Sequence, residues 1–297
     1  MASSDASVIT SSTKHQRGSH VDFICGWSAG CIVTVILYPL NKVIFRQQLH
    51  AIPSSEAAIQ LKSEGIRYLY RGLLPPLMKR TSSTAIMFGM YEKYQNILGC
   101  TYESDRRKTS FTFCHAQAAA MAGATESLLT PFERVQTLLQ SNAYHGKFRN
   151  TIEAVKTVSN HGFLEFYRGF HVILFRNAFS NILFFSLRDP FKYAILDKFP
   201  TKCERTSYNL FSDFVSGSVL GASLSTLFFP VNVVKTKIQA DMGKKYDHFF
   251  NVLKDVWNER DHSLKEVYRG AQLNFIRSLL AWGITNATFE YMRKWFT

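Results

Sequence analysis

A ten-residue segment that begins with proline and ends with glutamine occurs three times in the 297-residue chain. The copies begin at Pro39, Pro131 and Pro230, which are 92 and 99 residues apart. A Tyr-Arg-Gly triplet follows each copy, with its arginine 32, 37 or 39 residues after the proline. Self-similarity at such a spacing is the signature of a repeat architecture. The chain is therefore predicted to fold as three copies of one unit of roughly a hundred residues.

Each proline lies at or near the end of a stretch without Asp, Glu, Lys or Arg. These stretches are 19, 17 and 21 residues long and cover 23–41, 109–125 and 214–234. Such lengths are close to what a helix needs to span a bilayer. A second uncharged stretch in each unit is shorter, at 81–91, 177–187 and 278–289. These second stretches span a bilayer only if a charged residue at each end lies within or beside it, so the pattern favours a helical membrane protein.

Two weaker patterns repeat with the same register. Small residues stand 13 and 9 residues before each proline, where they let membrane helices approach closely: Gly26 and Gly30, Ala118 and Ala122, and Gly217 and Gly221. Tight packing in any helical protein would show the same spacing. Between the two uncharged stretches of each unit lies an amphipathic segment, predicted to be a helix on a membrane surface: Ser54–Ser63, Thr151–Ser159 and His248–Trp257.

The composition sets broader limits. With 46% hydrophobic residues and a mean hydropathy of -0.08, the chain suits a large soluble enzyme or a membrane protein around a polar cavity. The net charge of +13 favours anionic partners such as nucleic acid, acidic lipid or a phosphorylated or carboxylated solute. Residues 1–20 lack an apolar run, which predicts a disordered tail without a secretory signal. The five cysteines form no Cys-x-x-Cys pair and are interpreted as mostly reduced packing residues, without a disulfide framework or a zinc site.

The repeated motif resembles that of the mitochondrial carrier family. The family repeat reads Pro-x-[Asp/Glu]-x-x-[Lys/Arg]-x-[Lys/Arg], an amphipathic segment, then [Asp/Glu]-Gly and aromatic-[Lys/Arg]-Gly. Glu64-Gly65 and Tyr70-Arg71-Gly72 match it fully, whereas His161 and His262 replace the acid in the other units. The resemblance implies an all-α membrane protein with six transmembrane helices in three pseudosymmetric repeats, short amphipathic helices on the matrix side, and a place in the inner membrane. The implied divisions are a tail at 1–20 and repeats at 21–100, 109–198 and 208–297.

Several segments are similar to the animal NAD carrier branch of that family: 42–48, 70–77, 133–140, 174–177 and 232–239. This similarity implies a carrier that moves NAD between cytosol and matrix by alternating access. A carrier of a di- or tricarboxylate or another nucleotide-type anion is the alternative, because Arg176-Asn177 resembles the keto- and dicarboxylate carriers. No GxGxxG, P-loop, HExxH or Ser/His/Asp arrangement is evident, so an enzyme is not expected. The scattered Lys and Arg argue against a nucleic-acid-binding protein.

In the family, the motif acid of one odd-numbered helix pairs with the motif base of the next and closes the matrix side. Here the acid positions hold Asn41, Glu133 and Asn232, and the base positions hold Ile44, Gln136 and Lys235. Only Glu133 and Lys235 can form an ion pair. Asn41 and Gln136 can share an amide hydrogen bond, and Asn232 is expected to face Ile44 without a charge to meet. So many lost charges also leave open a relative that does not transport.

The glutamines Gln48, Gln140 and Gln239 are expected to brace this gate, because each carries two donors and two acceptors. They complete the matrix gate. The cytoplasmic gate follows from the pattern [Phe/Tyr]-[Asp/Glu]-x-x-[Lys/Arg] on the even-numbered helices: Glu92 with Gln95, Asp189 with Lys192, and Glu290 with Arg293. Arg188 stands where an aromatic residue is expected. With three acids and two bases, the cytoplasmic gate is expected to be the stronger one and to bias the resting carrier.

A cation precedes each cytoplasmic-gate acid by thirteen residues, about 20 Å along a helix: Lys79, Arg176 and Arg277. Unpaired cations at that depth are costly, which predicts an anionic ligand. With Arg80 and Asn177 they form the expected substrate set, and arginine suits a pyrophosphate. Glu126 either balances a cationic nicotinamide ring or neutralises a cation such as Arg176. Trp282, with Phe88 and Phe184, either stacks a base or packs against lipid and core.

The resemblance also bears on the remaining partners. It implies that the chain needs no cofactor or metal, does not bind nucleic acid and works as a monomer. It implies cardiolipin contacts at Gly72, Gly169 and Gly270.

Overall fold

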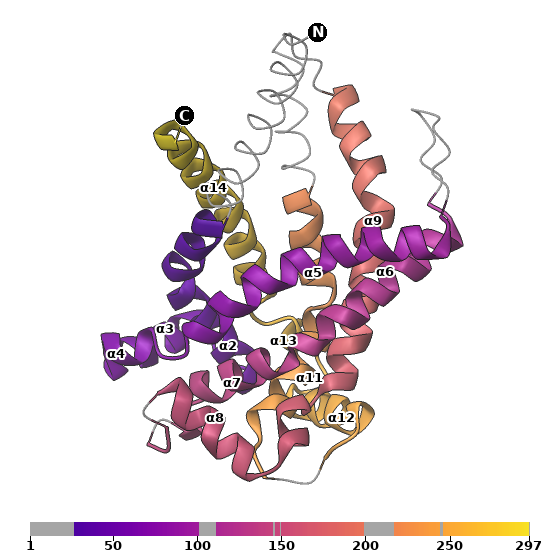
Figure 1. Cartoon of the computed structure of the whole chain (residues 1–297). Helices are drawn as coiled ribbons and strands as arrows, with labels where there is room; N and C mark the ends of the chain where they lie inside the picture. Colours follow the sequence, from indigo (N-terminus) through magenta and orange to yellow (C-terminus); the bar gives the residue numbers. More distant parts are fainter. Residues whose placement is uncertain are drawn as a thin grey trace, which may run out of the picture.

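The computed structural model of the chain describes residues 27–100, 111–144, 146–148, 150–198, 217–243 and 246–296. Every regular element in these ranges is a helix, and the helices follow one another in the same order in each unit (Figure 1). Each unit has a helix broken near its proline, a short helix, and then a long helix. The all-helical class predicted for the chain is confirmed.

The helices have the following bounds. The first unit contains Trp27–Ile36, α2 (Tyr38–His50), α3 (Ser54–Glu64), α4 (Ile66–Leu69) and α5 (Leu74–Leu98). The second contains α6 (Phe113–Glu126), η1 (Ser127–Leu129), α7 (Thr130–Gln140), η2 (Asn142–Tyr144), α8 (Thr151–Asn160), η3 (Phe163–Tyr167) and α9 (Phe170–Lys198). The third contains Gly217–Leu227, α11 (Phe229–Ala240), α12 (Phe249–Glu259), α13 (Leu264–Val267) and α14 (Ala271–Phe296). The three amphipathic segments are helices α3, α8 and α12, as predicted.

The proline of each motif marks a break in the first helix of its unit. Pro39, Pro131 and Pro230 are each the second residue after the break, in α2, α7 and α11. Proline lacks an N–H and its ring clashes with the carbonyl four residues earlier, so a helix cannot run straight through it. The helix axis bends by 58° before α2 and by 62° before α11, and η1 carries the break in the second unit.

The helices of the described chain are not equally suited to span a membrane. By length and composition, Phe163–Phe191 can cross a bilayer, and the described part of the chain contains up to three such spans if each bent pair is counted as one. Helices α5 and α14 are long enough, with 25 and 26 residues, but Lys79, Arg80 and Arg277 lie within them. Charged residues at membrane depth are costly unless they face a polar cavity.

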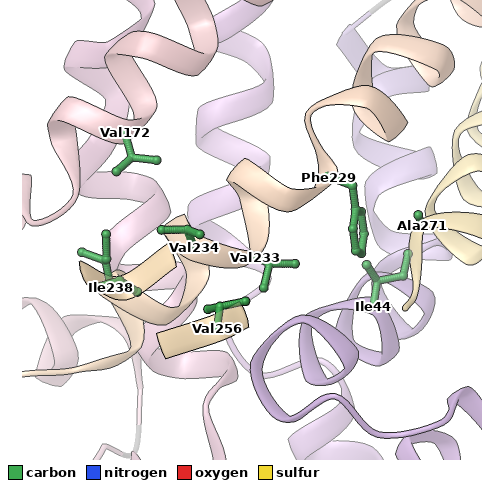
Figure 2. Close-up of a cluster of buried hydrophobic side chains, with 9 residues drawn as sticks. Ile44, Val172, Phe229, Val233, Val234, Ile238, Val256 and Ala271 are labelled. Carbon is green, nitrogen blue, oxygen red and sulfur yellow. The ribbon is translucent and has the colours of Figure 1, made fainter. Parts of the chain in front are cut away.

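Buried apolar side chains hold helices of all three units together. The main cluster joins α2, α9, α11, α12 and α14 (Figure 2). Ile44 of α2 packs there with Phe229 of α11 and Ala271 of α14. Ile44 occupies a base position of the matrix gate, so apolar packing takes the place of an ion pair at this point.

The paired small residues behave differently in different units. Ala118 and Ala122 are completely buried in a second cluster that includes Tyr91 of α5 and Phe185 of α9. Gly217 and Gly221 make no comparable contact, because a Cβ added to either would meet nothing within 4 Å. The predicted close packing is therefore found in the second unit, whereas the glycines of the third leave space.

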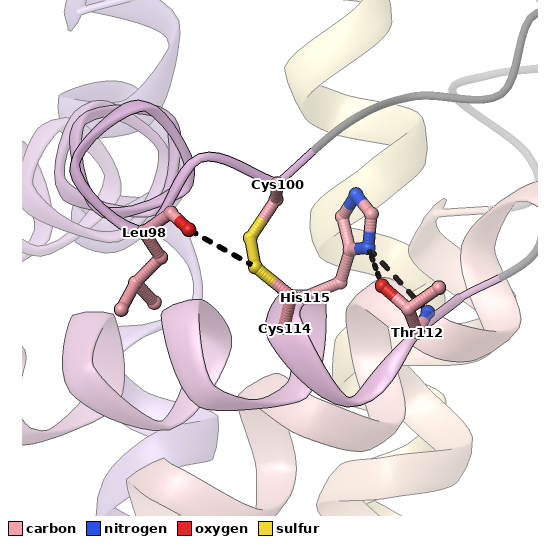
Figure 3. The surroundings of a disulfide bond; sticks show 5 residues. All are labelled: Leu98, Cys100, Thr112, Cys114 and His115. Atoms are coloured by element: carbon pink, nitrogen blue, oxygen red, sulfur yellow. Dashed lines mark hydrogen bonds between the residues drawn. A yellow bond between two sulfur atoms is a disulfide. The ribbon is translucent and has the colours of Figure 1, made fainter.

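The hairpin between α5 and α6 is closed by a disulfide bond between Cys100 and Cys114 (Figure 3). Helix α5 ends at Gly99, whose φ of 65° is left-handed, one residue before Cys100. The interpretation of the cysteines as mostly reduced is therefore wrong for this pair. Cys31 is free, while Cys25, Cys203 and Gly26 lie outside the described residues.

Candidate functional site

Three cavities of about 270, 440 and 400 Å³ share lining residues and therefore adjoin one another, and together they are called the central cavity here. We call them the gate cavity, the middle cavity and the far cavity. Lys79 lines the gate and middle cavities, and Arg80 lines the middle and far cavities. Arg277 lines all three. The predicted substrate cations thus mark a path from the matrix gate to the far cavity.

The carboxylate of Glu133 on α7 is shared by three cations. Lys235 Nζ of α11 donates to Oε2 at 2.8 Å, and Lys79 Nζ of α5 donates to Oε1. Arg176 Nη2 of α9 lies 3.7 Å from Oε1. The expected Glu133–Lys235 contact is therefore one arm of a four-residue group, which we call the charge cluster. Three positive charges against one negative leave this cluster with a net charge of +2.

Arg176 also contacts Asn232, which occupies a motif position where the family pattern has an acid. Its Nη1 donates to Asn232 Oδ1 at 3.1 Å, and its Nη2 donates to Asn177 Oδ1 at 2.6 Å. Asn177 in turn donates to Ser127 Oγ at 3.3 Å. The expectation that Asn232 meets no charge is wrong. The guanidinium of Arg176 on α9 binds Asn232, and Ile44, the expected neighbour of Asn232, packs in the core instead.

Each motif glutamine shares a hydrogen bond with a hydroxyl on a neighbouring motif helix, the motif helices being α2, α7 and α11. The bonds are Thr236 Oγ1 to Gln48 Oε1 at 3.1 Å, Thr137 Oγ1 to Gln239 Oε1 at 3.3 Å, and Gln140 Nε2 to Tyr38 Oη at 3.3 Å. They link α2 to α11, α11 to α7 and α7 to α2, and so close a ring, here called the glutamine ring. The threonines stand six residues after their prolines. Phe45 occupies that position in the first unit, and Tyr38 supplies the hydroxyl instead.

The amide pair expected between Asn41 and Gln136 is not formed. Both side chains line the gate and middle cavities, and in the described structure they share no hydrogen bond. Two polar amides thus face the cavity where the family pattern places an acid and a base. An amide presents both donors and acceptors to a ligand or to water.

Arg277 is held by neutral groups. Its Nε and Nη2 donate to Asn274 Oδ1 at 3.3 and 3.1 Å, and Nη2 also donates to Ser278 Oγ at 3.1 Å. Asn274 is itself fixed by a bond from its Nδ2 to Ser225 Oγ at 2.8 Å. Arg277 forms no ion pair with any described side chain. Its guanidinium is therefore oriented by its neighbours but not neutralised by a carboxylate.

Glu126 is not the partner of Arg176. It accepts a hydrogen bond from Ser83, and Ser83 lines the middle cavity. Glu126 forms no ion pair with a described side chain, so the idea that it neutralises Arg176 is not supported. The side chain of Trp282 lies outside those that the structure describes.

The cytoplasmic gate is described only in part. Glu92 is exposed and Asp189 is half-buried, and neither forms an ion pair with a described side chain. Gln95 Nε2 is buried without a hydrogen-bond partner in the described part of the chain. Lys192, Glu290 and Arg293 have side chains outside the described set. The strength of this gate stays a prediction, whereas the structure has the matrix-gate contacts formed.

A network of arginines near the matrix gate was missed by the sequence analysis. Arg46 pairs with Glu64 at 2.6 Å, and the completely buried Arg134 pairs with Glu165. Arg260 Nη2 donates to the Gln48 carbonyl at 2.8 Å. Arg46 and Glu64 both belong to the motif, so pairing them was within reach of the sequence. Glu165 stands four residues after His161, where the motif acid is absent, and carries no comparable signal.

Comparison with known proteins gives a consistent result. A family model described as mitochondrial carrier protein matches residues 15–101, 108–199 and 206–297. The human mitochondrial nicotinamide adenine dinucleotide transporters SLC25A52 and SLC25A51 are each 44% identical over 293 residues, covering 96% of this chain and 95% of the relative. A probable mitochondrial 2-oxodicarboxylate carrier of Dictyostelium discoideum is 27% identical over 280 residues, covering 92% of this chain and 90% of the relative.

Proposed function

The chain belongs to the mitochondrial carrier family, and from this membership we propose that it carries NAD across the inner membrane by alternating access. As a member, it is a multi-pass inner-membrane transporter and not an enzyme. The two human relatives that match almost the whole chain are named as transporters of this dinucleotide, which supports the choice of substrate.

The single observation that carries the proposal is the position of Arg277. It lines all three cavities, and its partners among the described side chains are neutral. Planar guanidinium donors match two oxygens of a phosphate group. With Arg80 beside it in the middle and far cavities, Arg277 supplies the charge for a diphosphate.

The charge cluster links binding to opening of the matrix gate. Lys79 holds Glu133 and also lines the middle cavity, so a phosphate oxygen there competes with Glu133 for the same ammonium. The net charge of +2 suits a group with two negative charges. When the ligand takes Lys79, Glu133 keeps Lys235 and the more distant Arg176, and the contact between α5 and α7 weakens. The cytoplasmic gate then closes as the matrix gate opens.

The same proposal extends to the membrane arrangement. Six spans are formed by 27–50, α5, α6 with α7, α9, 217–240 and α14, within repeats at 21–100, 109–198 and 208–297. Their charged residues face the central cavity, which accounts for helices too polar to meet lipid on every side. Gly72, Gly169 and Gly270 each stand shortly before a long helix, where backbone N–H groups suit a lipid phosphate such as that of cardiolipin. The carrier works as a monomer.

Transport by purified protein in liposomes tests the proposal. Wild-type protein is expected to take up labelled NAD, and Arg277→Ala is expected to lower uptake at least tenfold. Arg277→Lys keeps the charge but loses the two-pronged donor geometry, so it should retain part of the activity. Lys62→Gln on the exposed face of α3 is the control for loss of a positive charge. Absence of NAD uptake by the wild type would overturn the proposal.

A dicarboxylate carrier is the second candidate. Arg176 followed by Asn177 resembles the keto- and dicarboxylate carriers, and the two side chains bond to each other. The Dictyostelium relative is named for 2-oxodicarboxylates. Labelled 2-oxodicarboxylate added outside the same liposomes separates the candidates. Uptake of the dicarboxylate without uptake of NAD would favour the dicarboxylate carrier.

A further inference from the structure

The far cavity contains two aromatic rings and an arginine that the proposed function leaves without a role. Phe88 of α5 lines it together with Phe184 and Arg188 of α9. The Arg188 guanidinium carbon lies 5.6 Å from the centre of the Phe88 ring, and Phe184 meets Phe88 edge-on at 6.3 Å between ring centres. Phe88 is 39% exposed, so part of its ring remains available to a ligand.

A further wall of the far cavity is made by glycine. Gly217 and Gly221 line it on the helix before α11, with Ser278 and Thr285 of α14 nearby. A Cβ on either glycine would meet nothing within 4 Å, so the space in front of both is open. A cavity of about 400 Å³ bounded by aromatic rings and by a wall of small residues, Gly217, Ser218, Gly221 and Ala222, suits a flat ring.

The charges beside the cavities distinguish the two rings of a dinucleotide. Oxidised NAD has a cationic nicotinamide ring, a diphosphate and a neutral adenine. Arg188 in the far cavity repels a cationic ring but packs well against a neutral aromatic one. Glu126 accepts a hydrogen bond from Ser83, which lines the middle cavity, and can balance the cationic ring there against Lys79, which lines the same cavity. Arg80 and Arg277 line both cavities and stand where the diphosphate joins the halves.

We propose that the far cavity is the adenine site of this carrier, with the adenine ring stacked against Phe88 and Arg188. The diphosphate then lies at Arg80 and Arg277, and the nicotinamide ring enters the middle cavity. This assignment rests on the proposed transport of a dinucleotide. It gives a role to Arg188, which stands where the family pattern has an aromatic residue.

Photochemical labelling locates the adenine directly. Purified wild-type protein is irradiated with NAD that carries an 8-azido group on its adenine, and the labelled peptides are identified by mass spectrometry. Label is expected on Phe88, Phe184 or Arg188 or within 217–222, which line the far cavity and not the middle one, and excess unmodified NAD should suppress it. Label confined to 33–41, 76–79 and Ser83, which line the middle cavity and not the far one, would overturn the assignment.

Substitution of Phe88 gives a second, functional readout. Phe88→Leu keeps an apolar side chain but removes the ring, and the KM for NAD should rise about tenfold, because the base loses its stacking partner. Phe88→Tyr keeps the ring, and its KM should stay within about twofold of wild type. An unchanged KM in Phe88→Leu, or equal losses in both variants, contradicts a stacking role.

Filling the glycine wall tests the shape of the site without disturbing the fold. Gly221→Val projects into the open space of the far cavity and should raise the KM at least as much as Phe88→Leu. Gly283→Val on α14 is the matched control, because that glycine is also free of neighbours and lines none of the three cavities. If wild-type protein takes up NAD, and Phe88→Leu and Gly221→Val do so with the wild-type KM, the assignment of the adenine site is wrong and the proposed function stands. If wild-type protein takes up no NAD, the proposed function itself falls.

Discussion

The two ends of the central cavity are built from different kinds of contact. At the matrix gate, α2, α7 and α11 are joined by the charge cluster and by the glutamine ring. At the opposite end, α5, α6 and α9 are joined by stacked and edge-on aromatic rings, with Tyr91 and Phe185 at 3.7 Å between ring centres, and by the Cys100–Cys114 disulfide.

This difference separates the part of the carrier that can open from the part that stays together. Hydrogen bonds and ion pairs between helices can be exchanged for bonds to water or ligand at a modest net cost. Buried aromatic area and a covalent bond have no such substitute in water. The matrix gate is therefore suited to reversible opening, whereas the α5–α6–α9 side is suited to move as one body.

The largest effect is expected from Glu133→Gln, which breaks the matrix gate at its centre. Glu133 is only 5% exposed and serves three cations, so the substitution leaves buried positive charges uncompensated. Loss of one partner from a buried pair costs about 3–5 kcal/mol. NAD uptake into liposomes should fall about a hundredfold. Glu56→Gln, which removes an exposed acid on α3, is the control and should transport normally.

The cluster also changes what a charge swap can show. Combining Glu133→Lys with Lys235→Glu restores one pair, but it places an ammonium beside Lys79 and Arg176. The double variant should therefore remain inactive. Full recovery of uptake would mean that Glu133 and Lys235 act as an isolated pair.

The next effect concerns the opposite end of the cavity. Cys100→Ser opens the disulfide-closed loop, and a cross-link over 14 residues contributes about 3 kcal/mol. The midpoint of thermal unfolding in detergent should fall by several degrees. Cys31→Ser, which removes the free cysteine, should leave it unchanged. Equal midpoints for the two variants would show that the covalent link does not hold α5 to α6.

A smaller effect is expected from the glutamine ring. Thr236→Val preserves shape but removes the hydroxyl bound to Gln48, and one such hydrogen bond contributes about 1 kcal/mol. Thermal unfolding without ligand should shift slightly downward, and Thr236→Ser should restore the wild-type value. Because the ring carries no charge, the shift should be the same at low and high salt. A shift that disappears in high salt would point to an electrostatic cause.

The smallest effect is expected from Glu92→Gln. This acid is exposed and forms no ion pair with a described side chain, so unfolding stability should change by less than about 0.5 kcal/mol. A change as large as that of Glu133→Gln would show that both ends of the cavity are held by buried charge, and the contrast between them would be lost.

Features with a local cause could be predicted from the sequence. Pro39, Pro131 and Pro230 break the first helix of each unit, because the steric effect of proline depends only on neighbouring residues. The helices α3, α8 and α12 follow from the spacing of apolar residues along one short segment. The Glu133–Lys235 contact was implied by the family resemblance, in which the motif acid of one repeat pairs with the motif base of the next.

Contacts that depend on the reach and rotation of side chains could not be predicted in the same way. Lys79 and Arg176 were expected to be free for a ligand, yet both reach Glu133, Lys79 from α5 and Arg176 from α9. Asn41 and Gln136 have matching chemistry but share no hydrogen bond in the described structure. The ring hydroxyl of Tyr38 replaces a threonine that the first unit lacks, which no positional rule would supply.

The disulfide between Cys100 and Cys114 has a consequence for orientation. Disulfides persist only where thiol-reducing systems do not keep cysteines reduced. The mitochondrial matrix contains such systems, so an α5–α6 hairpin exposed to it would lose the bond. We therefore propose that the end of the molecule with the Cys100–Cys114 pair faces the intermembrane space and that the charge cluster lies nearer the matrix.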